Sequence, residues 1–367
     1  MPGQIPGKRQ DWIFLSFSGK NIFCSRTKSC PGKPVAIKTF YVLTNDKRSG
    51  ILLCTVNKSN VSLQNPEHYL MNNNFRKSGI LLVLTAGFSW GVLGVFVRGL
   101  TGFGLSPSDI SSLRALGAAL LLAGVSLTLC REAFRMKLRD LWCVAGCGLL
   151  SVTLFNICYF YTISRTTVNI AVVLLYTSPA FVMLMSVLFF KEKLTFRKIL
   201  SLFAVLTGCV LVSGVIFSNN AISCRVMLTG LGAGFFYALY TIFSRFAQIR
   251  SYSGMTITLW AFLFAGSAGV FMLDWQNTLQ VVVSGGVKFW GLAAGLVLIS
   301  TLLPYWSYTA GLKKLTPSLA AIFATVEPVV GTLIGIMLFN EKLTWTALAG
   351  MLIIIGAVFF AGTFGEN

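Results

Sequence analysis

Two apolar segments of this chain carry a proline near their middle and end in the same tetrapeptide, Glu-Lys-Leu-Thr. In the first segment Pro179 precedes Glu192 by thirteen residues, and in the second Pro328 precedes Glu341 by thirteen. The two copies lie 149 residues apart. An internal repeat of this length predicts a fold built from two equivalent halves.

The composition is that of an integral membrane protein. Hydrophobic residues make up 55% of the 367 residues and charged residues 11%, against about 25% charged in a soluble domain. The mean hydropathy is +0.76. Apolar runs of about 20 residues cross a hydrocarbon core of about 30 Å, and they must be helical because lipid offers the backbone no hydrogen bonds. We predict an all-α integral membrane fold with ten transmembrane helices, near 79–97, 109–129, 141–163, 168–189, 197–217, 226–246, 254–273, 288–310, 316–339 and 345–364.

The net charge of +19 is arranged as a topology signal and not as a nucleic-acid-binding surface. Twelve basic residues fall in the loops near 130–140, 190–198, 245–250 and 313–314, whereas the intervening loops hold five. Because cytoplasmic loops are rich in Lys and Arg, the first set is predicted to face the cytoplasm. Both ends of the ten-helix unit would then be cytoplasmic, in a multi-pass protein of the cytoplasmic (inner) membrane.

Neither a metal site nor a cofactor is expected. The nine cysteines are scattered without a CxxC pair, and the single histidine, His68, precedes the first span. The chain has no GxxxxGK[ST] nucleotide-binding motif, so energy for transport would come from a gradient or from exchange.

Residues 1–78 differ in character from the rest of the chain. They contain no apolar run long enough to span a membrane, and we predict a poorly structured, basic N-terminal extension. At Met71 a short polar, basic segment leads into the first span. Two interpretations stand: Met71 is the native start and the preceding stretch extends the reading frame upstream, or that stretch is a cytoplasmic tail.

The repeat covers two halves of five helices each, predicted at 79–217 and 226–364. Gly87 in the first span, for example, aligns with Gly234 in the sixth. Because five is odd, equivalent points of the halves face opposite sides of the membrane. Inverted-topology repeats are typical of secondary transporters, which bind substrate near the middle of the bilayer.

At these elements the chain resembles the drug/metabolite transporter superfamily, in particular its EamA-type members. The resemblance rests on the paired five-helix halves, Leu-Tyr-Thr-Ser-Pro at 175–179, Val-Glu-Pro at 326–328 and the two Glu-Lys-Leu-Thr segments. It covers about residues 79–363. It implies ten helices, a central cavity and alternating access, often in the direction of export, for substrates that range over amino acids, sugars, nucleotide derivatives and drugs.

Glu327 is the one acidic residue well inside a predicted span, about 16 Å into the ninth helix. A carboxylate at that depth is costly unless it is protonated, paired or open to a water-filled cavity, so it is a functional candidate. It binds an amino or other cationic group, or takes up a coupling proton; the alternative is a neutral or paired acid that braces the break at Pro328. The first half has Ser178 at the equivalent position. Glu192 and Glu341 are interpreted as helix-end and loop charges.

Pro179 and Pro328 are hinge candidates, together with Gly331 and Gly335. Prolines at matched depths either kink packed helices or break them and expose backbone dipoles to substrate. The small-residue pair on the ninth helix lets neighbouring helices approach closely and slide.

Further substrate candidates are polar or aromatic. Arg114, a few residues inside the outer end of the second span, snorkels outward, pairs with Asp109, or binds an anionic group in the outer vestibule. Asn156 contacts either a neighbouring helix or the substrate. Four aromatic residues, each a packing residue or part of a cavity wall, complete the set: Trp90, Tyr176, Tyr237 and Tyr305.

The sequence therefore predicts a secondary active transporter, and not an enzyme, that exports small organic metabolites such as amino acids by alternating access. Its expected partners are the solute, the lipid bilayer and, in one interpretation, a coupling proton, but no nucleic acid. The alternative is a membrane scaffold or receptor without transport. An intramembrane enzyme would need a nucleophile–base pair or a metal cluster, and the predicted spans hold no histidine.

Overall fold

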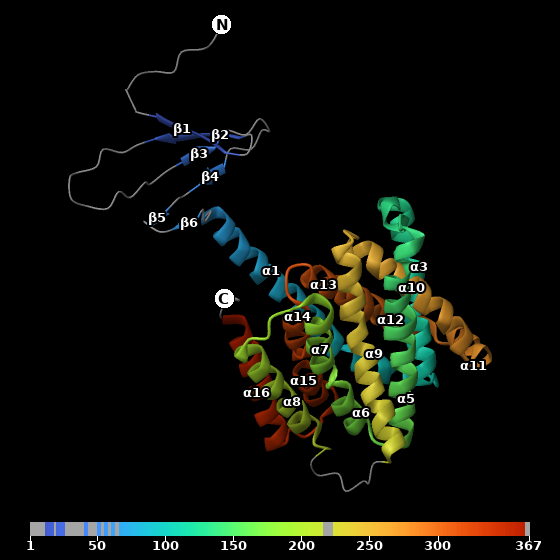
Figure 1. Cartoon of the computed structure of the whole chain (residues 1–367). Coiled ribbons are helices and arrows are strands. Elements are labelled where there is room, and N and C mark those ends of the chain that lie inside the picture. The colour runs from blue at the N-terminus through green and yellow to red at the C-terminus, as the bar shows by residue number, and fades with distance from the viewer. Residues whose placement is uncertain are drawn as a thin grey trace. The chain divides into compact units, whose positions relative to one another are not determined.

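The computed structural model describes residues 12–17, 20–25, 40–42, 50–52, 55–57, 60–62, 66–215 and 223–363 (Figure 1). The chain divides into two units, Met1–Lys77 and Ser78–Asn367.

The first unit contains short antiparallel strands, a local order that its composition did not predict. β1 pairs with β2, β2 with β3 and β3 with β4, while β5 pairs with β6. Helix α1 begins at Pro66, upstream of Met71, so the polar segment before the first span is helical. The strands are β1 (Trp12–Phe17), β2 (Lys20–Ser25), β3 (Phe40–Val42), β4 (Gly50–Leu52), β5 (Thr55–Asn57) and β6 (Asn60–Ser62).

The second unit consists of helices and loops over its described residues. The first half contains α1 (Pro66–Gly91), α2 (Leu93–Thr101), α3 (Pro107–Leu129), η1 (Arg131–Phe134), η2 (Leu138–Asp140), α4 (Leu141–Ala145), η3 (Gly146–Leu154), α5 (Phe155–Arg165), α6 (Val168–Leu175), α7 (Ser178–Phe190) and α8 (Phe196–Ser213). The second half contains α9 (Cys224–Ile249), α10 (Gly254–Met272), α11 (Trp275–Ser284), α12 (Gly286–Val297), η5 (Leu298–Leu302), α13 (Leu303–Leu312), α14 (Pro317–Ala324), α15 (Val326–Phe339) and α16 (Trp345–Thr363).

Ten helices within the described residues, several built from consecutive elements, are long and apolar enough to cross a membrane. They run from Asn74–Thr101 to Trp345–Gly362, and their limits lie within a few residues of the predicted ones. This confirms the predicted all-α membrane fold. The short helices η1 and α11, which lie between spans, were not predicted.

The packing of the spans follows the repeat. α3 lies against α10 and α8 lies against α16, which pairs the second span with the seventh and the fifth with the tenth (Figure 1). α5 packs on α9 and α12 packs on α2, so the third span of each half lies against the first span of the other. Each half therefore completes its packing with the same elements of its counterpart.

The fourth and ninth spans are both broken, between α6 and α7 and between α14 and α15. Pro179 and Pro328 follow the breaks closely because proline lacks an N–H and disfavours helical geometry in the residue before it. At each break a threonine hydroxyl donates to the carbonyl three residues earlier, from Thr177 at 2.6 Å and from Thr325 at 2.5 Å. The predicted mid-span interruptions are thus present at matched depths.

Glycines in the first and sixth spans allow these helices to lie directly against the break of the opposite half. A Cβ at Gly87 would lie 2.8 Å from the Ala324 carbonyl oxygen. A Cβ at Gly234 would lie 2.8 Å from the Leu174 carbonyl oxygen. Both separations are shorter than a carbon–oxygen contact permits, so a side chain at either position would push the break away.

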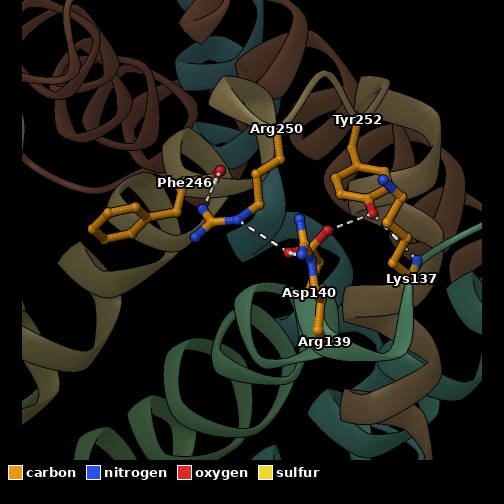
Figure 2. Close-up of polar contacts among 6 residues, drawn as sticks. All are labelled: Lys137, Arg139, Asp140, Phe246, Arg250 and Tyr252. Atoms are coloured by element: carbon orange, nitrogen blue, oxygen red, sulfur yellow. Dashed lines mark hydrogen bonds and ion pairs between the residues drawn. The ribbon is translucent and has the colours of Figure 1, made fainter.

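A polar cluster ties the loop before the third span to the loop between α9 and α10 (Figure 2). Asp140 accepts a hydrogen bond from the Tyr252 hydroxyl at 2.8 Å and forms an ion pair with Arg250, with Nε 3.1 Å from Oδ1. The Lys137 backbone N–H donates to the Tyr252 hydroxyl at 3.2 Å. The Arg250 guanidinium also lies 5.1 Å from the ring centre of Trp142. An ion pair and hydrogen bonds therefore connect the two halves at one end of the bundle.

Candidate functional site: a cavity between the two halves

A cavity is lined by residues from both halves of the bundle. Its wall includes α1, α7, α9, α13 and the breaks in the fourth and ninth spans. The predicted substrate residues that line it are Trp90, Tyr176, Tyr237, Tyr305 and Glu327, and the hinge candidate Pro179 lines it as well.

Glu327 lies in the first turn of α15, next to the break in the ninth span, and is partly exposed to the cavity. Tyr176, which lies at the break in the fourth span, lines the same cavity as Glu327. The first turn of a helix favours a carboxylate because the unpaired N–H groups there carry partial positive charge. Ser178 also lines the cavity, so the two halves present different chemistry to one space.

Arg114 is buried in α3, with 7% of its surface exposed, and does not snorkel outward. Its Nε has no hydrogen-bond partner among the residues whose side chains the structure describes. Asp109 is engaged elsewhere, with Ser106 and with the Asp274 backbone N–H at 3.0 Å. Arg114 lies close enough to Glu327 to interact with it electrostatically. Arg114 is not among the residues that line the central cavity. A buried donor without a partner is costly, so Arg114 remains a candidate to bind an anionic group.

Aromatic rings form one wall of the cavity. The ring centre of Trp90 lies 6.3 Å from that of Tyr237, 5.4 Å from that of Tyr305 and 5.5 Å from that of Tyr308. These edge-on and tilted contacts hold the rings in defined orientations. The faces of such rings attract cationic groups.

Two further cavity residues, Tyr240 and Tyr308, were not among the predicted candidates. Tyr240 shares a 3.1 Å hydrogen bond with Thr309, and Tyr308 shares a 2.7 Å hydrogen bond with Thr241. Their hydroxyls are therefore satisfied within the protein, and they serve as a fixed wall. The helical spacing from Tyr237 to Tyr240 is the sequence signal that places both tyrosines on one face of α9.

The third and eighth spans carry π-helical segments at matched positions, η3 and η5. Ser151 in η3 lines the cavity, and its hydroxyl donates to the carbonyl of Gly146, five residues back, at 3.1 Å. Thr301 in η5 donates to the carbonyl of Leu296, also five residues back, at 2.8 Å. π-Helical turns are frequent at functional sites.

Asn156 lies apart from the central cavity. It is buried and lines a separate pocket with Ser108, Ser112 and Thr153. Its predicted contact with substrate is therefore not supported by a shared cavity.

The remaining hinge candidates, Pro328, Gly331 and Gly335, lie on α15 and are not among the residues that line the central cavity. A Cβ at Gly331 would lie 3.7 Å from the carbonyl oxygen of Gly91 on α1, whereas Gly335 faces the Glu341 side chain. These residues shape how α15 packs and do not contribute side chains to the site.

Comparison with known proteins identifies the family to which the chain belongs. Residues 77–214 and 225–363 each match the model of the EamA-like transporter family. An uncharacterized transporter of Archaeoglobus fulgidus is 28% identical over 285 residues, which cover 76% of this chain and 97% of that protein. The pseudopaline exporter CntI of Pseudomonas aeruginosa is 26% identical over 303 residues, which cover 78% of this chain and 97% of that protein. A solved protein crystal structure shares the fold, with a TM-score of 0.63 at 15% identity, and the match covers 78% of this chain and 96% of that one. With two copies of the family's domain over ten apolar helices, this chain belongs to the EamA-like transporter family of multi-pass membrane proteins.

Proposed function

We propose that this protein is a secondary active transporter that exports small organic metabolites carrying both an amino group and a carboxylate, such as amino acids and related solutes. The observation that carries this proposal is the central cavity, with a carboxyl at Glu327, a buried unpartnered donor at Arg114 nearby, and aromatic rings between the halves. Glu327 would bind the amino group and Arg114 the carboxylate. The relatives are named as transporters, which favours transport over catalysis.

The location of Arg114 and Glu327 in different halves supports transport by alternating access. Arg114 belongs to the first half and Glu327 to the second, so a solute that bridges them contacts both halves at once. A ligand shifts a conformational equilibrium only through its differential affinity for the two states, and a bridging solute has that property. The name of the pseudopaline exporter supports the outward direction, and the basic loops support cytoplasmic ends for the ten-helix unit.

Reconstitution of the full chain into liposomes tests the proposal. Loaded vesicles should exchange at least one labelled amino acid or amino-acid derivative, and Glu327→Gln should lower the rate at least about tenfold, since a charge-assisted hydrogen bond is lost. Arg114→Gln should slow the exchange of solutes that have a free carboxylate more than the exchange of the corresponding amides. Glu132→Gln is the matched control, because Glu132 is an exposed acid paired with Arg135 outside the cavity.

Two results would contradict the proposal. If no solute of a broad panel exchanges, a scaffold or receptor explains the protein better. If Glu327→Gln exchanges at the parental rate and with the same dependence on pH, Glu327 neither binds the solute nor carries a coupling proton.

A further inference from the structure

The two Glu-Lys-Leu-Thr segments form the same connector in both halves. Lys191 and Asn340, which follow α7 and α15, have φ angles of 54° and 51°. The backbone N–H groups of Glu192 and Glu341 donate to the carbonyl six residues back, at 3.3 and 3.2 Å. In each copy the threonine then caps the next helix. Glu192 and Glu341 thus occupy equivalent backbone positions, which the inverted repeat puts at opposite ends of the bundle.

Glu192 lies in the loop between α7 and α8, as predicted, but its side chain is buried. It forms an ion pair with Lys198, with Nζ 2.9 Å from Oε1, and both side chains are 5% exposed. Its second oxygen accepts a hydrogen bond from the backbone N–H of Ser318 at 3.4 Å. Ser318 lies in the first turn of α14, which is the first part of the broken ninth span. A carboxylate of the first half therefore caps a helix of the second half.

The Glu341 side chain is 47% exposed and instead pairs with Arg98, with Oε1 2.5 Å from Nη2. The residue equivalent to Ser318 is Asn169, in the first turn of α6. No hydrogen bond joins Glu341 to Asn169 within the part of the chain that the structure describes. The connector of the first half therefore contacts the start of a broken span of the other half, whereas the connector of the second half contacts Arg98 in the first span.

The starts of the two broken spans differ in the same way. Pro317 and Ser318, at the start of α14, are buried, whereas Val168 and Asn169, at the start of α6, are exposed. Each glutamate also has an arginine nearby from the first span of the opposite half: Arg98 pairs with Glu341, and Arg245 lies close enough to Glu192 to interact electrostatically. Each glutamate therefore has an arginine of the opposite half nearby, but Lys198, which pairs with Glu192, corresponds to Ala347 in the second copy.

We infer that Glu192 and Glu341 are a pair of alternating latches. In the state seen here Glu192 caps α14 and closes one end of the cavity. In the opposite state Glu341 leaves Arg98 and accepts from the backbone N–H of Asn169, which closes the other end, while Glu192 releases Ser318. The latches rest on the proposed transport function, since they alternate access to its cavity. Each contact joins a connector glutamate to a backbone N–H in the first turn of a broken span, so the two states exchange one such contact for the other.

Cysteine labelling of the purified full-length protein in lipid nanodiscs tests this inference. Asn169→Cys and Ser318→Cys report the two helix starts, and a hydrophilic maleimide is quantified at each site by mass spectrometry, with the exposed native Cys224 as internal reference. With both latches intact, the cysteine at 169 should react and the cysteine at 318 should be protected. Glu192→Gln should raise labelling at 318 about tenfold and lower labelling at 169, because loss of a charged hydrogen bond shifts the population by about that factor.

A second substitution distinguishes a pair of alternating latches from a helix cap at Glu192 that acts only on α14. Glu341→Gln added to Glu192→Gln should restore labelling at 169, since neither end can then close. Glu132→Gln, an exposed surface acid, should leave both sites at parental levels. If Glu192→Gln exposes 318 while 169 is unchanged, Glu192 is only a helix cap and the inference is wrong; unchanged labelling at both sites overturns it as well. The measurement uses no solute, so a failed solute panel in liposomes would reject the proposed substrate and leave this result standing.

Discussion

Buried polar side chains in this bundle divide according to whether the protein satisfies them. Tyr240, Tyr308 and Asp140 each have a partner across a helix interface, which suits a structural role. Arg114 has a buried Nε without a partner among the described side chains, and Glu327 faces a cavity. Burial of an unsatisfied donor is a cost that folding alone does not favour, so we propose a role in solute binding for Arg114 together with Glu327.

Removal of the Asp140 carboxylate should destabilise the protein. Asp140→Asn removes the charge that pairs with Arg250 and weakens the bond from Tyr252, so the free energy of unfolding should fall by about 1–3 kcal/mol. Thermal denaturation of the detergent-purified protein measures the change. Glu132→Gln, which alters only an exposed pair, should leave the midpoint in place. Equal stability of Asp140→Asn and the parent would show that the cluster in Figure 2 contributes little.

At the scale of the element, each broken span depends on a glycine of the opposite half. The break in the ninth span lies against Gly87 of α1, and the break in the fourth span lies against Gly234 of α9. Proline interrupts the helix, and the absence of a Cβ lets a neighbouring backbone approach the interruption. The breaks are therefore properties of pairs of elements and not of single helices.

Substitution of these glycines by alanine tests that dependence. Gly87→Ala and Gly234→Ala should each destabilise the protein by about 1–3 kcal/mol, because the added methyl group overpacks the contact. Gly94→Ala is the control: no atom lies within 4 Å of a Cβ added there, and alanine favours helix more than glycine does. Thermal midpoints of the three variants decide the matter. A Gly234→Ala protein as stable as Gly94→Ala would mean that α9 does not press on the break.

At the scale of the whole molecule, the halves exchange equivalent contacts. The second and seventh spans pair, as do the fifth and tenth, and the third span of each half packs on the first span of the other. With five spans to a half, this packing requires the repeats to be inverted in the bilayer. Opposite orientation is what allows equivalent connectors to act at opposite membrane surfaces.

The inverted arrangement predicts the sidedness of the two Glu-Lys-Leu-Thr loops. Lys193→Cys should be labelled by an impermeant reagent only from the cytoplasmic side of sealed vesicles, and Lys342→Cys only from the external side. Vesicles of the two orientations, labelled before and after permeabilisation, give the answer. Labelling of both positions from one side would contradict the inverted repeat.

Much of this architecture was predictable because its determinants are local. Apolar length defines a span, and Pro179 and Pro328 mark the breaks since a missing N–H acts within one turn. Glu327 stood out for the same reason, as a charge inside an apolar run. The burial of Arg114 and the burial of the Glu192 side chain were not predictable, since both depend on which helices surround them.

The sequence by itself determined ten helices in two repeated halves, the positions of the breaks in the fourth and ninth spans, and the one acid well inside a predicted span. It did so because hydrophobicity, proline and spacing act along the chain. Only the tertiary structure decided which polar groups meet. It brought Glu327 to Tyr176 and Arg114, put Asn156 in a separate pocket, and buried Glu192 against α14 while Glu341 stayed exposed. Those outcomes arise from packing between distant segments. The two identical Glu-Lys-Leu-Thr tetrapeptides cannot by themselves specify which glutamate is buried.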